Sequence, residues 1–439
     1  MLSDVTAAAA PSESSGQEAI ALPAFCLISA QLLLVGAAIY QFHLVSHAFL
    51  TLLALAGCGF IVHSFLRLAD RPRFFVLLSL CAILAVLGGA GAGILVSLAS
   101  ALIALAILPV RLSIRVALIA LLAGALILLR GGWLRLAGFS ESAIPIWPIL
   151  GSMFMFRLIV YLYDRHHESE PPPLSQTLAY FFLLPNVCFP LFPVIDFKTF
   201  LRRYYDAPAA EIYQRGVAWM LLGISHLLLF RLVKYHLFLD LSEVRTGPEL
   251  LLCFVSGYLL YLRVSGDFHL VCGLLHLFGF HLPSTHRWYF FAPDMAELAR
   301  RINSSWSAFR GKIVFLPASS SARRWGLSPL LAAVVGGVLV WLASILFHAW
   351  QWFWIRGVFP LTAVDAVFWL LVDSVVLLQA LRLLRQRAPA KRPPLSAFAL
   401  RAASTAATFA FVCVMWSVWN SDSLGEWFST VSQAVRRWR

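Results

Sequence analysis

One histidine of this sequence stands where an imidazole could act as a general base. His348 comes near the end of an almost uniformly apolar stretch and is followed by a tryptophan-rich run at 350–354. Burial among apolar side chains disfavours the charged imidazolium, so such a histidine stays neutral and can take a proton from a hydroxyl group. The alternative interpretation is a histidine that only hydrogen-bonds a neighbouring helix.

A polar stretch precedes this apolar segment and offers groups that could hold a substrate. Asn303 lies in it, 45 residues before His348, and its amide can both donate and accept hydrogen bonds. Several basic side chains flank Asn303 and could receive phosphate groups: Arg300, Arg301, Arg310 and Lys312. Contact with lipid head groups is the simpler interpretation for each of these cations.

The sequence lacks the residue patterns of several other kinds of active site. The histidine pairs His43 with His47 and His166 with His167 lack cysteine or carboxylate companions at ligand spacing, so we predict no metal site. The phosphate-binding glycine motifs, the zinc-protease motif and the serine-hydrolase motif do not occur. The seven cysteines lie in or beside apolar runs without a Cys-x-x-Cys pair, and we interpret them as packing residues.

The composition indicates which elements must position these groups. The chain has 439 residues, of which 60% are hydrophobic and only 13% charged, whereas soluble proteins carry about 25% charged residues. Its apolar stretches repeatedly exceed the roughly 20 residues that cross a bilayer as a helix. We therefore predict an all-α, polytopic membrane protein with about eleven spans and no sizeable soluble domain.

The predicted spans alternate with stretches too polar to cross a membrane. The spans cover about residues 20–42, 47–66, 74–109, 114–130, 144–163, 176–195, 216–238, 246–264, 268–282, 327–350, 359–381 and 396–419. Of these, 74–109 is long enough for two short passes. The stretches 196–215 and 283–326 mix aromatic and charged residues and are expected to lie in the interface or to re-enter a protein-lined cavity.

The net charge reflects a membrane setting. It is +13, from 34 Lys+Arg against 21 Asp+Glu, and most basic residues lie between apolar spans. The positive-inside rule and anionic lipids account for such loops, so we expect the lipid bilayer as a partner and no nucleic acid. The bias toward arginine and alanine suggests a GC-rich genome and hence a bacterial inner membrane.

The polar stretch and His348, read in order, resemble the membrane-bound O-acyltransferase (MBOAT) family. The run 300–303, Arg-Arg-Ile-Asn, is similar to the family's Arg-Arg-Trp-His or Arg-Arg-Trp-Asn element, and His348 with its tryptophans is similar to the element of the second histidine. Further similar features lie upstream: Phe156 to Asp164, the Phe-Pro pairs at 189–193, Asp267, Gly273, Leu277 to Pro283 and Tyr289. The departures are Ala299, Ile302 and Ala349, which replace family Trp and Gly residues.

The resemblance covers about residues 150–360 and implies both a fold and an activity. An acyl group would move from a thioester, acyl-CoA or an acyl carrier, to a hydroxyl of a glycan or lipid. His348 would be the general base and Asn303 would position the reactants, with substrate contacts from Arg300, Arg301, Trp306, Arg310, Lys312, Trp350 and Trp352. The thioester would be a co-substrate and no cofactor would be bound. A periplasmic partner protein is plausible, as for several bacterial relatives.

The resemblance also divides the chain. We expect a disordered tail at 1–19, N-terminal transmembrane helices at 20–149, an MBOAT-like catalytic core at 150–381, and a transmembrane helix with an interfacial amphipathic helix at 382–439. The runner-up function is a transporter or flippase for an amphipathic substrate, although the sequence has no internal repeat of the kind many transporters show. A third alternative is a catalytically inactive relative that scaffolds a membrane complex.

Overall fold

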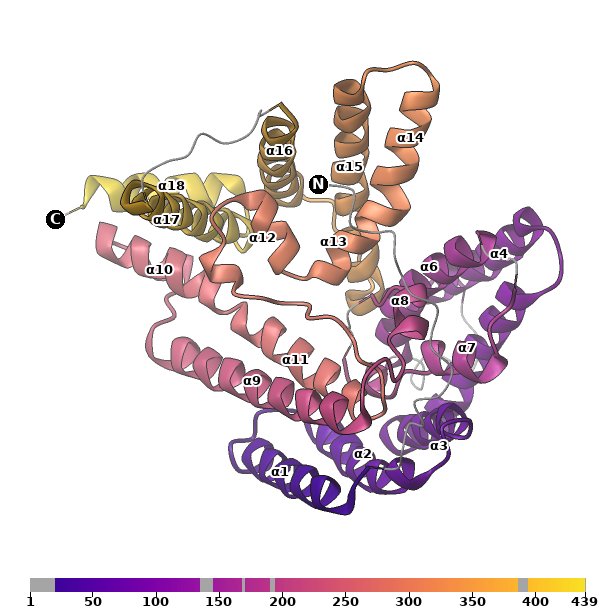
Figure 1. The fold of residues 1–439 in the computed structure, drawn as a ribbon. Coiled ribbons are helices and arrows are strands. Elements are labelled where there is room, and N and C mark those ends of the chain that lie inside the picture. Colours follow the sequence, from indigo (N-terminus) through magenta and orange to yellow (C-terminus); the bar gives the residue numbers. More distant parts are fainter. Residues whose placement is uncertain (1–19, 135–144, 168–169, 190–193, 386–393, 439) are drawn as a thin grey trace.

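The computed structural model of the chain describes residues 20–134, 145–167, 170–189, 194–385 and 394–438. The predicted tail at 1–19 lies outside these residues. Across the described ranges every named element is a helix (Figure 1), so the all-α prediction is confirmed for them.

The helices fall into three consecutive groups. The first comprises α1 (Leu22–Gln41), α2 (His47–Phe65), α3 (Arg71–Ile107), α4 (Leu112–Arg130), η1 (Pro148–Phe154), α6 (Met155–His166), α7 (Leu174–Phe181), η2 (Leu184–Val187) and α8 (Phe197–Arg202). The second comprises α9 (Ala209–His236), η3 (Leu241–Glu243), α10 (Gly247–Leu259) and α11 (Leu262–His276). The third comprises η4 (Tyr289–Phe291), α12 (Met295–Arg301), α13 (Ser304–Arg310), η5 (Gly311–Phe315), α14 (Leu316–Arg324), α15 (Pro329–Arg356), α16 (Ala363–Arg385), α17 (Pro394–Trp419) and α18 (Leu424–Arg436).

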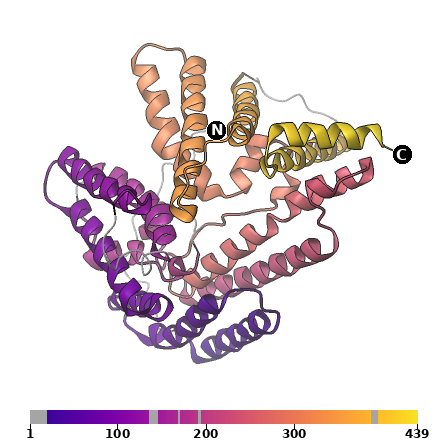
Figure 2. The ribbon, with the colours of Figure 1, turned by 180° about the vertical axis from the view of Figure 1, so that it is seen from behind.

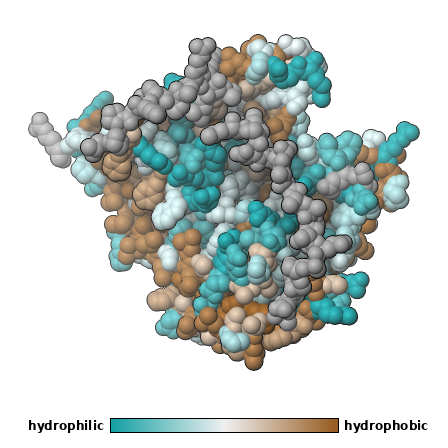
Figure 3. All heavy atoms as spheres, in the orientation of Figure 1, coloured by the Kyte–Doolittle hydropathy of each residue, from teal (hydrophilic) through white to brown (hydrophobic). Residues whose placement is uncertain are grey.

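The chain is an integral membrane protein. Nine helical segments in the described part are long and apolar enough to cross a bilayer: α1, α2, α3, α4, α9, α10 with α11, α15, α16 and α17. Large apolar side chains such as Leu33, Leu34 and Leu121 remain more than 70% exposed on these helices. In Figure 3, hydrophilic residues gather over the centre of the visible face and hydrophobic ones over its left and lower rim. The apolar rim is the surface that lipid would contact.

The described span count is lower than the predicted eleven for two reasons. The expected span at 144–163 holds η1 followed without a break by α6, a helical run that is not among these nine, and the expected span at 176–195 contains the short helices α7 and η2. The spans at 246–264 and 268–282 join through a short turn at Leu260 and Tyr261 into one segment, Gly247–His276. Conversely, the long stretch at 74–109 does contain a break, because Gly88 takes a non-helical conformation with φ 69° and ψ 176°.

Helices α9 and α11 pack closely because glycines face each other between them (Figures 1 and 2). A Cβ added to Gly216 would lie 2.7 Å from the carbonyl oxygen of Gly273, and one added to Gly223 would lie 2.9 Å from that of Gly266. Small residues at such positions let two membrane helices approach backbone to backbone, where van der Waals packing holds them together.

We expect Gly273→Val to separate α9 from α11 and to lower the thermal midpoint of the detergent-solubilised protein by several degrees. Both the Gly216 carbonyl and the Met220 side chain lie within 3 Å of the added Cβ, so the helices themselves must move. Gly257→Val on α10 is the matched control, because nothing lies within 4 Å of its Cβ position. Equal midpoints for the two variants would contradict this packing.

The predicted re-entrant stretch at 283–326 folds as a series of short helices, of which α12 and α13 lie near the centre of the molecule. In Figure 1, α12 and α13 lie between the α10–α11 segment and the helices α15 and α16, which both contact this pair. Asp294 caps α12 by accepting a 2.6 Å hydrogen bond from the backbone N–H of Glu297. The Ser304 backbone N–H donates to the Thr285 carbonyl at 3.0 Å, which ties α13 to the loop before it.

The predicted helix near the C-terminal end of the described chain is confirmed. Helix α18 begins after Ser423, whose hydroxyl accepts a hydrogen bond from the Glu426 backbone N–H at 3.1 Å. Trp427 on this helix donates to the Ser417 hydroxyl of α17 at 3.0 Å. Its position in a membrane interface stays a prediction.

Candidate active site

His348 and Asn303 line the same cavity. This histidine cavity has a volume of about 300 Å³ and is walled by aromatic side chains of five segments, among them Tyr261, Trp306 and Trp416. Helix α15 supplies His348, about two turns before its end at Arg356. Asn303 stands at the junction of α12 and α13. Two residues that are 45 positions apart in the sequence are therefore brought to one enclosed space.

The imidazole of His348 has a hydrogen bond at one nitrogen atom and a carboxylate near the other. The Trp352 indole N–H, one helical turn further along α15, donates to Nε2 at 2.7 Å. Nδ1 lies 3.5 Å from Oδ1 of Asp365 at the start of α16. Because Nε2 accepts a hydrogen bond, the proton of the neutral ring must be on Nδ1, where it faces the carboxylate.

Asp365 is itself fixed by two donors. The Trp419 indole N–H donates to its Oδ1 at 2.9 Å, and the Thr362 hydroxyl donates to its Oδ2 at 2.6 Å. The Asp365 backbone N–H donates back to Thr362 at 3.0 Å, an arrangement that also caps the first turn of α16. Only 8% of Asp365 is exposed, so the carboxylate is buried but well satisfied.

Asn303 has a conformation that asparagine tolerates better than most residues. Its φ of 42° and ψ of 53° lie in the left-handed region, and its carbonyl accepts the first backbone hydrogen bond of α13, from Trp306 at 2.9 Å. No hydrogen bond joins its side-chain amide to another residue within the described ranges. The residue type thus has a local structural reason, and the amide stays available to a ligand.

Arg310 and Lys312 are neutralised inside the protein. Arg310 lies 3.2 Å from Asp373 and donates to the Ser344 hydroxyl at 2.6 Å, and it lines the histidine cavity. Lys312 pairs with Asp164 at 2.5 Å and also with Asp196. Burial opposes ionisation of Asp196, but the hydrogen bonds from Lys312 and Thr199 and the charge of Lys312 together outweigh it, so the pKa of Asp196 lies below its usual value.

Lys312 belongs to a second cavity. This lysine cavity, about 710 Å³ in volume, is lined by polar groups that suit recognition of hydroxyls, among them Asp196, Thr199, Thr285 and Ser305. It shares Val194 with the histidine cavity.

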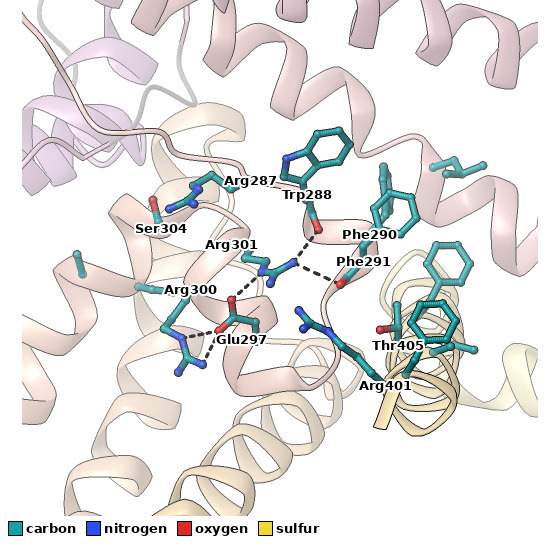
Figure 4. A pocket seen from close by; sticks show the side chains of 17 residues that line it. Arg287, Trp288, Phe290, Phe291, Glu297, Arg300, Arg301, Ser304, Arg401 and Thr405 are labelled. Carbon is teal, nitrogen blue, oxygen red and sulfur yellow. Dashed lines mark hydrogen bonds and ion pairs between the residues drawn. The ribbon is translucent and has the colours of Figure 1, made fainter. Parts of the chain in front are cut away.

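Arg300 and Arg301 face a third and larger space, the arginine cleft shown in Figure 4. Its volume is about 1620 Å³, and its lining combines Arg287, Arg300, Arg301 and Arg401 with Trp288 and phenylalanines. Both Arg300 and Arg301 bind Glu297, the latter at 2.7 Å, and these bonds hold the pKa of Glu297 below its usual value. Four guanidinium groups against one carboxylate leave the cleft strongly positive.

Two of these arginines have no internal counter-charge. Arg287 and Arg401 are exposed and, among the residues that the structure describes, form no ion pair. In Figure 4 they lie on opposite sides of Arg301, one in the loop before η4 and the other on α17. The cleft thus offers free guanidinium groups beside aromatic side chains, a combination that suits an amphiphilic anion.

The short helix α13 separates these three spaces. Ser307 lines both the arginine cleft and the histidine cavity, whereas Ser304 and Ala308 line both the arginine cleft and the lysine cavity. A molecule bound in the cleft is therefore one helix away from the histidine, and so is a molecule bound in the lysine cavity.

The predicted tryptophans differ in their placement. Trp306 lines the histidine cavity and stacks on Phe309, with ring centroids 5.3 Å apart. Trp352 lines it as well. Trp350 points elsewhere and packs edge-on against Trp354 at 5.4 Å, outside the lining of this cavity.

Sequence reasoning missed several residues of these sites. Asp365, Asp373 and Arg401 all lie within predicted spans, at 359–381 and 396–419. A charged residue inside an apolar span is itself a functional signal, because it is costly unless it has a partner. The charged or titratable partners of Asp365 and Asp373, which are His348 and Arg310, could not be inferred because they come from other helices.

No protein-family model and no curated protein matches the chain. The resemblance to MBOAT proteins therefore stays a prediction from the motifs.

Proposed function

We propose that this protein is a membrane-embedded acyltransferase that moves an acyl group from a thioester to an alcohol. The single observation that carries the proposal is that His348 and Asn303 line one enclosed, aromatic cavity. A neutral imidazole and an uncommitted amide are the groups such a transfer requires. The MBOAT resemblance of the surrounding sequence supports the same activity and an MBOAT-like fold.

The proposed reaction needs one base and one hydrogen-bond donor. Nε2 of His348 takes the proton of the acceptor hydroxyl while the oxygen bonds to the thioester carbon. The carbon–sulfur bond then breaks, and the leaving thiolate receives the proton from Nε2. Asn303 hydrogen-bonds the thioester oxygen or the acceptor. General-base catalysis of this kind is worth about 10²- to 10⁴-fold, and an enclosed site limits competing hydrolysis.

The arginine cleft suits a donor that carries phosphate groups, such as acyl-CoA or the phosphopantetheine of an acyl carrier. Its free cations, Arg287 and Arg401, lie on the cleft side of α13. The lysine cavity, on another side of α13, offers Asp196 and Thr285 to the hydroxyl groups of a glycan or lipid acceptor. Arg310 and Lys312 would then shape their cavities as ion pairs, and a direct role for them in substrate binding stays a prediction.

The setting that we propose is a bacterial inner membrane, on the strength of the composition. A periplasmic partner protein that passes the acyl group onward remains part of the same hypothesis.

The double variant Arg287→Gln/Arg401→Gln is expected to raise KM for acyl-CoA by about tenfold or more. It removes two charge-assisted hydrogen bonds to the donor phosphates, each worth about 1.5–3 kcal/mol. The kcat should change little, and the KM of the wild type should rise with ionic strength. Arg324→Gln on α14, an exposed arginine outside the cleft, is the control. An unchanged KM would remove the cleft from the donor site.

The proposal is tested by incubating purified protein with acyl-CoA and a panel of glycan and lipid alcohols, followed by mass spectrometry. We expect a product heavier than one acceptor by one acyl group, together with free CoA. The open, cationic cleft also suits the alternative function, a transporter or flippase for an anionic amphiphile. In that case substrates would cross vesicle membranes without chemical change.

A further inference from the structure

We infer that Asp365 is a positioning residue for His348 and that Trp352 masks the base until an acceptor displaces its indole. This inference rests on the proposed function and adds two residues to it. It comes from the hydrogen bond that Trp352 donates to the imidazole and from the approach of the Asp365 carboxylate to its other nitrogen.

Asp365 favours Nε2 of His348 as the base once the Trp352 indole is displaced. Its Oδ1 lies 3.5 Å from Nδ1, so the carboxylate favours the tautomer with the proton on Nδ1 and the lone pair on Nε2. Thr362 and Trp419 anchor the carboxylate from both sides. Asp365 touches no other part of the proposed machinery and acts through the imidazole alone.

Trp352 occupies the position that a substrate hydroxyl must take. Its indole nitrogen lies 2.7 Å from Nε2, within the range of about 2.6–3.2 Å that a general base needs to the atom whose proton it takes. The guanidinium of Arg356 stacks over the same indole, with 3.8 Å between its central carbon and the ring centroid. Both contacts come from within α15, so the indole can hold this position without a substrate.

A masked base has a chemical consequence. As long as the indole holds Nε2, a water molecule in the cavity cannot hydrogen-bond there and lose its proton. Water activated at Nε2 would attack the thioester carbon, the carbon–sulfur bond would break, and the thiolate would take the proton, with free acid as the product. An acceptor that displaces the indole makes the base available only for transfer. Trp352 therefore protects the thioester from hydrolysis.

The masking is tested with Trp352→Phe, which keeps an aromatic ring and removes the N–H donor. We expect acyl-CoA hydrolysis without acceptor to rise at least threefold relative to wild type. Trp350→Phe is the matched control, since this neighbouring residue packs on Trp354 and has no bond to His348. Hydrolysis that stays at the wild-type rate in Trp352→Phe, or rises equally in both variants, would overturn the masking role.

The positioning role is tested with Asp365→Asn, which keeps the shape and removes the charge. We expect kcat for transfer to fall about 10- to 100-fold, with KM within twofold of wild type. The same change in a Ser-His-Asp triad lowers kcat by about 10⁴-fold. The loss should be smaller here because the distance from the carboxylate to the imidazole, 3.5 Å, is longer. If Asp365→Asn lowered the thermal midpoint in proportion to the loss of activity, and added acyl-CoA restored both, the role of Asp365 would be structural only.

A spectroscopic measurement tests the inference without any activity. In protein labelled with ¹⁵N at histidine, the imidazole signal that disappears in His348→Gln should show a protonated Nδ1 and an unprotonated Nε2. Asp365→Asn should move the Nδ1 resonance while the Trp352 N–H keeps the proton off Nε2, and Trp352→Phe should move the Nε2 resonance. A proton on Nε2 in the wild type would overturn the inference even if acyl transfer is found. The absence of acyl transfer would overturn the proposed function while the tautomer could still be as inferred.

Discussion

His348→Ala is expected to abolish acyl transfer while the protein still folds in membranes. The variant removes the only imidazole that lines the histidine cavity among the described residues, so the acceptor hydroxyl loses its base. We expect kcat to fall by about 10²- to 10⁴-fold, with a thermal midpoint within a few degrees of wild type. The measurement is transfer of a radiolabelled acyl group by purified protein in detergent.

Two further variants are measured for comparison with His348→Ala. His236→Ala, at the exposed end of α9, should retain full activity. Asn303→Ala should lower kcat by a smaller factor than His348→Ala, because positioning and hydrogen bonding remain partly available from other groups. If His348→Ala transferred acyl groups at the wild-type rate, the proposed mechanism would be wrong.

Arg310→Met is expected to cause the largest loss of stability. The side chains of Arg310 and Asp373 are 12% and 10% exposed, so the variant leaves a nearly buried carboxylate with the Ser344 hydroxyl as its remaining partner. Loss of one partner of a buried ion pair costs about 3–5 kcal/mol. The expected result is a large fall in the thermal midpoint and in the yield of monodisperse protein.

The double variant Arg310→Met/Asp373→Leu distinguishes the effect of an unpaired carboxylate from the effect of losing the Arg310 side chain. Because both charges are then absent, we expect it to recover most of the stability lost by the single variant. Should Arg310 serve mainly as a phosphate ligand, Arg310→Met would instead raise KM for the donor at unchanged stability. The same experiment therefore tests the sequence-based prediction that Arg310 binds substrate.

The membrane helices could be predicted from the sequence because their signal is local. Length and hydrophobicity suffice for helices such as α15 and α16. The predicted spans differ from the structure where an apolar stretch does not form one helix long enough to cross the membrane. Residues 176–195 are apolar, yet the described part of this stretch holds only the eight-residue α7 and the four-residue η2. The backbone angles of Leu260 and Tyr261 stay close to helical, and no sequence signal indicated that α10 continues into α11.

The candidate site was predictable only in part, for a similar reason. His348 and Asn303 could be selected because each is an unusual residue in its own surroundings. The state of the basic residues could not, since it depends on partners far away in the chain. Asp196 binds Lys312 across 116 positions, and Arg310 meets Asp373 across 63. Such pairings follow from the packing of helices, which a single sequence does not reveal.

The central claim is that a thioester and an alcohol react inside the histidine cavity. The most direct test uses sealed vesicles containing the purified protein, acyl-CoA labelled in the acyl group, and the acceptor panel. We predict label covalently bound to an acceptor with the wild type and none with His348→Ala. Unmodified donor or acceptor crossing the membrane at equal rates with both proteins, without any labelled ester, would contradict the claim.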